Sequence, residues 1–112
     1  MADKKEVFSN LIEETQKAEK NEKGEYRALL AKIYWDLNGI DCIDAKYMTN
    51  FNKLDGDTYN EKITHIDSFS FENCCTVLTF LIYGNGLIRG IFTEAVDAGE
   101  VLALLQRAYD LI

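Results

Sequence analysis

Residues 69–112 read FSFENCCTVLTFLIYGNGLIRGIFTEAVDAGEVLALLQRAYDLI, and they decide the fold. Apolar doublets recur there about every four residues: Cys74-Cys75, Val77-Leu78, Leu81-Ile82, Leu87-Ile88, Ile91-Phe92 and Ala95-Val96. An interval near 3.6 residues is typical of a helix, whereas a half-buried strand alternates every two residues. The stretch therefore predicts packed helices with tight joints at its glycines, and these helices supply most of the hydrophobic core.

Three helices are expected in this stretch. The first begins near Phe71, with Ser68 or Ser70 as its N-cap, and ends at Tyr83-Gly84. The second carries the doublets between 87 and 96, and the third covers 100–111. A competing interpretation is a β-hairpin turning at Asn85-Gly86, because Asn-Gly between apolar runs is a strong hairpin signal.

The first half of the sequence has the pattern of two further helices, over 5–20 and 25–37. Each has one apolar stripe, and Asn38-Gly39 is expected to stop the second helix, because glycine tolerates the left-handed conformation found there. Apolar residues from 40 to 54 keep helical spacing, with Asp41 or Asp44 as a candidate N-cap.

Residues 55–57, Asp-Gly-Asp, predict a turn. Thr58 and Glu61 have the spacing of a capping box, which indicates a short helix after it. A strand over 62–71 is the competing interpretation, because Ile, Thr and Phe are dense there. The whole chain, 1–112, is thus expected to form a single, mainly α domain: a compact bundle of five to six short helices.

The composition limits the classes of partner. Nineteen acidic residues oppose 12 basic ones, so the net charge is −7. Phosphate backbones and anionic membranes attract clustered lysines and arginines, and here the basic residues are scattered. We expect no direct binding to nucleic acid and no binding to membranes. An acidic surface suits a basic protein partner, or serves solubility alone.

The N-terminal sequence and the cysteines favour the cytoplasm. No apolar signal-peptide core follows Met1. The odd number of cysteines, Cys42, Cys74 and Cys75, suits reduced thiols better than a disulfide framework. No cofactor is expected.

The sequence points to no catalytic residue and no metal site. Cys74 and Cys75 are adjacent, so on a helix they cannot chelate as a C-x-x-C motif does. The pattern around Asp55 and Asp57 lacks the spacing of a calcium loop, and the glycines from 84 to 90 are one residue off the dinucleotide-binding pattern. A small enzyme or ligand-binding domain using His65 and Cys74 remains an alternative, since a cysteine nucleophile needs a base.

Aromatic residues concentrate between 26 and 59, interleaved with aspartates. Trp35 lies off the apolar stripe of the helix predicted over 25–37, so one interpretation is an exposed interface residue, with Tyr34 and Tyr47 nearby. The other interpretation is that Trp35 covers the middle segment as part of the core.

The block from Leu78 to Leu111 resembles the C-terminal part of a family of small uncharacterised bacterial and mobile-element proteins. The matching residues are Leu78-Thr79-Phe80, Leu81-Ile82, Gly84, Leu87-Ile88, Gly90, Gly99 and Leu104-Leu105. This chain departs from the family at its polar turn, where Tyr83, Asn85 and Gly86 replace charged residues and Arg89 replaces an acid. The resemblance implies a helical fold and no reaction.

The candidate binding residues are therefore six: Tyr34, Trp35, Tyr47, Tyr83, Asn85 and Arg89. The favoured function is a non-enzymatic protein-binding or regulatory module. A specific version is a mobile-element inhibitor that masks a nucleic-acid-binding defence protein of the host. A homo-oligomer joined through the apolar C-terminal helices is a further alternative.

Overall fold

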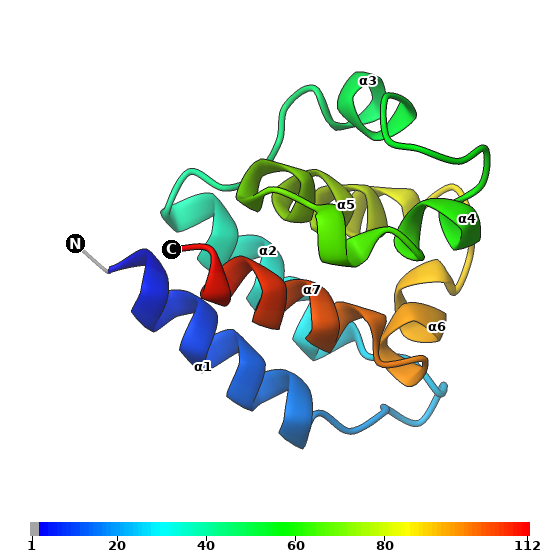
Figure 1. The fold of residues 1–112 in the computed structure, drawn as a ribbon. Helices are drawn as coiled ribbons and strands as arrows, with labels where there is room; N and C mark the ends of the chain where they lie inside the picture. The colour runs from blue at the N-terminus through cyan, green and yellow to red at the C-terminus, as the bar shows by residue number, and fades with distance from the viewer. Residues whose placement is uncertain (1–2) are drawn as a thin grey trace.

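The computed structural model describes residues 3–112 and confirms a mainly α fold (Figure 1). Within that range the chain forms seven α-helices, a 3₁₀ helix and no strand. The helices are α1 (Lys4–Lys17), α2 (Arg27–Gly39), α3 (Tyr47–Asn52), α4 (Tyr59–Ile63), the 3₁₀ helix η1 (Ile66–Ser68), α5 (Phe71–Gly84), α6 (Ile91–Asp97) and α7 (Glu100–Asp110). The hairpin at Asn85-Gly86 and the strand over 62–71 do not form.

Helix α5 lies at the centre of the bundle and packs against α2, α3, α6 and α7. A capping box begins the helix. The Ser70 side chain accepts from the Asn73 N–H, and the Asn73 side chain accepts from the Ser70 N–H. Ser70, and not Ser68, is therefore the N-cap. Because α5 is surrounded, nine of its residues are buried: Cys74, Cys75, Thr76, Val77, Leu78, Thr79, Leu81, Ile82 and Gly84.

No helix within 3–112 is long and apolar enough to cross a bilayer.

Helices α1 and α7 lie side by side and run in opposite directions, which brings the two ends of the described chain to one edge of the bundle (Figure 1). Both carry one apolar face. The face of α7 is wholly buried at four positions of helical spacing, Val101, Leu104, Leu105 and Ala108. These four residues belong to the core of the fold, while Leu102 and Tyr109 on the same helix stay partly exposed.

The first two helices are shorter at their facing ends than the sequence predicts. Helix α1 stops at Lys17 and not at Lys20, and α2 starts at Arg27 and not at Glu25. In the loop between them, the Asn21 side chain accepts from the backbone N–H groups of Lys23 and Glu25, both at 2.9 Å. Asparagine competes with helix formation by binding nearby backbone in this way.

Helix α2 also ends differently from the prediction at Asn38-Gly39. Gly39 is helical, and the left-handed residue is Asp41, with φ of 60°. The Cys42 N–H then bonds the Leu37 carbonyl at 2.8 Å and closes the helix end. Aspartate is among the few non-glycine residues that adopt this conformation singly. Neither Asp41 nor Asp44 is the N-cap of α3, because the N-cap position is Lys46 and carries no side-chain cap bond. Asp44 instead accepts from the Lys46 N–H in the turn that precedes α3.

Gly39→Ala is expected to raise the free energy of unfolding by about 0.5–1 kcal/mol, because alanine restricts the unfolded chain and favours the helix. A Cβ atom at Gly39 would meet nothing within 4 Å. Thermal unfolding measures the change. Gly90→Ala is the matched control: it also has free space, but its φ of 85° makes alanine unfavourable. Equal effects of the two substitutions would contradict the assigned backbone conformations.

The prediction of a helix across the doublets between 87 and 96 is wrong for its first residues, 87–90. Helix α6 begins only at Ile91, and Leu87 and Ile88 lie in a turn, 81% and 54% exposed. The left-handed Gly90 stands before α6 and interrupts any continuous helix. Asn85 closes the turn, because its side-chain oxygen accepts from the Phe92 N–H at 3.2 Å.

Candidate functional site: an exposed aromatic cluster

Four of the six candidate binding residues meet on the surface. Tyr34 and Trp35 come from α2, Tyr47 from α3 and Tyr83 from α5; we call them the aromatic cluster. The Tyr34 ring lies edge-on to Trp35, with centroids 5.1 Å apart, and edge-on to Tyr83, at 6.1 Å. Tyr83 stacks on Tyr47 at 5.4 Å. Helices from three parts of the chain thus present one continuous set of rings.

The cluster faces solvent. Trp35 is 65% exposed and Tyr83 43% exposed, while Tyr34 and Tyr47 are half-buried. The buried stripe of α2 passes through Ile33 and Leu37, and at about 100° per residue Trp35 points away from both. The interpretation of Trp35 as a core residue is therefore wrong.

The polar atoms of the cluster suit recognition more than acid–base chemistry. The neighbouring Tyr34 phenol raises the pKa of Tyr83 above its ordinary value, so this hydroxyl stays protonated at neutral pH and can donate a hydrogen bond. Rings with hydroxyl or indole N–H groups at their edges combine apolar contact area with directional hydrogen bonding. Such residues are enriched in the centres of protein interfaces.

Asn85 and Arg89 lie outside the aromatic contacts. They line a separate cavity of about 400 Å³, together with residues of α2 that include Arg27 and Leu30. The side chain of Asn85 is already bound to the backbone of Phe92. The structure therefore brings these two candidates near each other and gives Asn85 a role in the fold of the turn.

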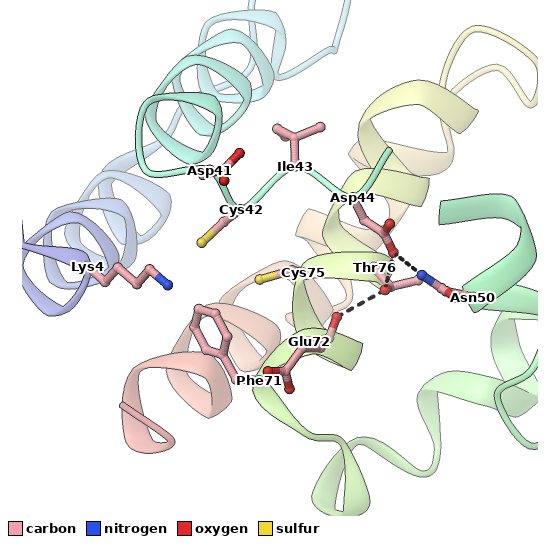
Figure 2. Close-up of a pocket in the computed structure, with 10 residues that line it drawn as sticks. All are labelled: Lys4, Asp41, Cys42, Ile43, Asp44, Asn50, Phe71, Glu72, Cys75 and Thr76. Carbon is pink, nitrogen blue, oxygen red and sulfur yellow. Dashed lines mark hydrogen bonds between the residues drawn. The ribbon is translucent and has the colours of Figure 1, made fainter. Parts of the chain in front are cut away.

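Asp44 holds α3, and with it Tyr47, against α5 (Figure 2). Its carboxylate accepts from the Thr76 hydroxyl at 2.6 Å and from the Asn50 amide at 2.9 Å. Its backbone N–H donates to the Thr79 hydroxyl at 3.0 Å. This connection was not predicted from the sequence. The available signal was the two threonines within the most apolar helix, since buried hydroxyls need partners.

Asp44→Asn is expected to reduce the free energy of unfolding at pH 7 by about 1–2 kcal/mol, because the amide is uncharged and only one of its two terminal atoms accepts hydrogen bonds. Partial burial raises the pKa of Asp44, but the bonds from Thr76, Asn50 and the Lys46 N–H outweigh burial and lower it. A lowered pKa gives stability that is present above the unfolded value, near 4, and is lost as pH falls through the folded value. Urea unfolding between pH 2 and 7 should show this loss in the natural chain and a smaller loss in Asp44→Asn.

The alternative site at His65 and Cys74 gains no support from the geometry. Cys74 is fully buried, and burial raises the pKa of its thiol to about 11. His65 is exposed and lines a cavity of about 450 Å³ with Asp55 and Glu72, and no cysteine lines it. Within 3–112 no group of three or more His, Cys, Asp or Glu side chains is placed to hold a metal ion.

Comparison of the chain with known protein families, with curated proteins and with solved structures finds no match. The resemblance of residues 78–111 to a family of small bacterial and mobile-element proteins therefore stays a prediction.

Proposed function

We propose that the protein is a non-enzymatic protein-binding module and that the aromatic cluster binds a basic partner protein. The observation that carries this proposal is the convergence of four aromatic side chains from α2, α3 and α5 on one surface, with the only tryptophan of the chain 65% exposed. Exposing a tryptophan to water is unfavourable, and tryptophan and tyrosine contribute a large share of the binding free energy in protein interfaces.

The charge of the chain supports a basic partner. A net charge of −7 attracts cationic surfaces and speeds their encounter. At close range, arginine and lysine side chains bind the faces of aromatic rings, tryptophan most strongly.

The described lysines of the same chain do not compete for the rings of the cluster. Among residues 3–112, four lysines lie over aromatic rings, and those rings belong to Phe51, Phe71, Tyr26 and Tyr109. None of them is a member of the cluster. The faces of Trp35 and its neighbours are thus not occupied by the lysines of the same chain in these four contacts.

Quantitative affinity capture tests the proposal. The bait is the whole chain, as the natural sequence, as Trp35→Ala and as Leu111→Ala, which removes an exposed apolar side chain outside the cluster. We expect basic proteins to be recovered with the natural chain and with Leu111→Ala, and to be lost with Trp35→Ala. Recovery of the same proteins with Trp35→Ala would overturn the proposal.

Light scattering of the natural chain distinguishes a second copy from a foreign partner. A monomer is expected. A dimer that dissociates in Trp35→Ala would show that the cluster binds another copy of this chain, and this result would contradict the proposed basic partner.

A further inference from the structure

A second feature, independent of the aromatic cluster, is a cavity of about 320 Å³ between the start of α1, the segment after α2 and the first turns of α5 (Figure 2). Cys42 and Cys75 both line it. In Figure 2 their sulfur atoms point into the same space, and the Lys4 ammonium points there from α1. The two thiols come from segments far apart in the sequence.

We propose that Cys42 and Cys75 form a redox-active dithiol site, which reacts with a low-molecular-weight disulfide and closes to an intramolecular disulfide. This inference does not depend on the proposed protein-binding function. Both cysteines line the same cavity from segments far apart in the sequence, and a disulfide between them requires their Cα atoms to come within about 7 Å.

The third cysteine shows what distinguishes the pair. Cys74 is adjacent to Cys75 in the sequence, yet it is 0% exposed and does not line the cavity. Cys42 and Cys75 keep 5% and 6% of their surface exposed, and both line the cavity. A small reagent that enters the cavity therefore reaches two of the three thiols.

Neighbouring groups shift the pKa values of the two thiols in opposite directions, which gives the thiols different roles in the reaction. The neighbouring Cys75 thiol lowers the pKa of Cys42 to about 7, and the positive charge of Lys4 adds to this effect, against burial and the charge of Asp41. The same neighbour and burial raise the pKa of Cys75, and Glu72 adds to the rise. Because the thiolate is the nucleophile, Cys42 attacks first and Cys75 is the resolving thiol.

The reaction balances in two exchange steps. The Cys42 thiolate attacks one sulfur of the small disulfide, forms a mixed disulfide, and releases one small thiolate, which takes a proton from solvent. Cys75 then loses its proton and attacks the Cys42 sulfur, which forms the Cys42–Cys75 bond and releases the second thiolate. The protein dithiol loses two electrons and two protons, and the small disulfide is reduced to two thiols.

Mass spectrometry of the whole folded chain tests this site, with oxidised glutathione as the probe. We expect the natural chain to lose the mass of two hydrogen atoms, and peptide mapping to show a Cys42–Cys75 link. Cys75→Ser should stop at a single glutathionyl adduct on Cys42, and Cys74→Ser should react like the natural chain. The rate should reach half its maximum near pH 7, and Lys4→Met should slow the reaction at that pH.

Three results would overturn the proposal: a disulfide that includes Cys74, reaction at Cys74 as fast as at Cys42, or no reaction of the folded natural chain. The mapping of the natural chain needs no substitution, so the test does not depend on whether a serine variant folds. Circular dichroism of the treated chain confirms that the reaction occurs in the folded state.

Discussion

Lys62→Met is expected to lower the free energy of unfolding by about 1–3 kcal/mol. Lys62 lies on α4 and is only 3% exposed. Its ammonium donates to the Leu54 carbonyl at 2.7 Å and to the Gly56 carbonyl, and it lies 5.4 Å from the centroid of the Phe51 ring. Methionine keeps the apolar contacts of the stem but leaves both carbonyls without their charged donor, which costs roughly 1–3 kcal/mol for a partly buried group.

Lys53→Met is the matched control for this prediction, because Lys53 is exposed and belongs to the adjoining segment. We expect it to change stability by less than about 0.5 kcal/mol. Urea unfolding, followed by circular dichroism, gives both values. Equal stabilities of the two variants would show that the turn at 54–57 does not depend on the Lys62 ammonium.

Trp35→Ala is expected to weaken binding of the basic partner about 30-fold, which corresponds to about 2 kcal/mol, the loss typical of a central interface tryptophan. The stability of the free chain should change little, because the Trp35 side chain is mostly in solvent. Isothermal titration calorimetry with the partner identified by capture measures the affinity.

The position of Tyr83 gives a second measure of the same surface. Tyr83→Ala removes the ring that joins Tyr34 to Tyr47, so it should also weaken binding, by a smaller factor. Leu111→Ala should bind as the natural chain does. If Trp35→Ala bound the partner with unchanged affinity, the aromatic cluster would not be the binding surface.

Where the sequence repeats every four residues without interruption, it was sufficient to predict the helices. Helix α5 and helix α7 begin and end within one or two residues of the predicted bounds, because each has a clear cap or glycine at its start. The same four-residue spacing gave a wrong prediction of helix at Leu87-Ile88. A turn that includes the left-handed Gly90 happens to keep the spacing of the apolar doublets, and periodicity alone does not report backbone conformation.

The sequence predicted the members of the aromatic cluster, but not that they lie together. Aromatic density and the helical position of Trp35 selected Tyr34, Trp35 and Tyr47, and the structure places them together with Tyr83. The closeness of α2, α3 and α5 depends on tertiary packing, which one sequence does not encode locally. Tertiary packing also brings Cys42 and Cys75 to one cavity, and no short sequence motif predicts that they share it.

The central claim is that the aromatic cluster is a solvent-facing surface available to a partner, and the fluorescence of Trp35 tests it most directly. Trp35 is the only tryptophan, so the emission reports this one position. In the free chain we expect an emission maximum close to that of tryptophan in water and strong quenching by iodide, with a blue shift and protection when the partner binds. A blue-shifted emission that iodide does not quench, in the free monomer, would contradict the account.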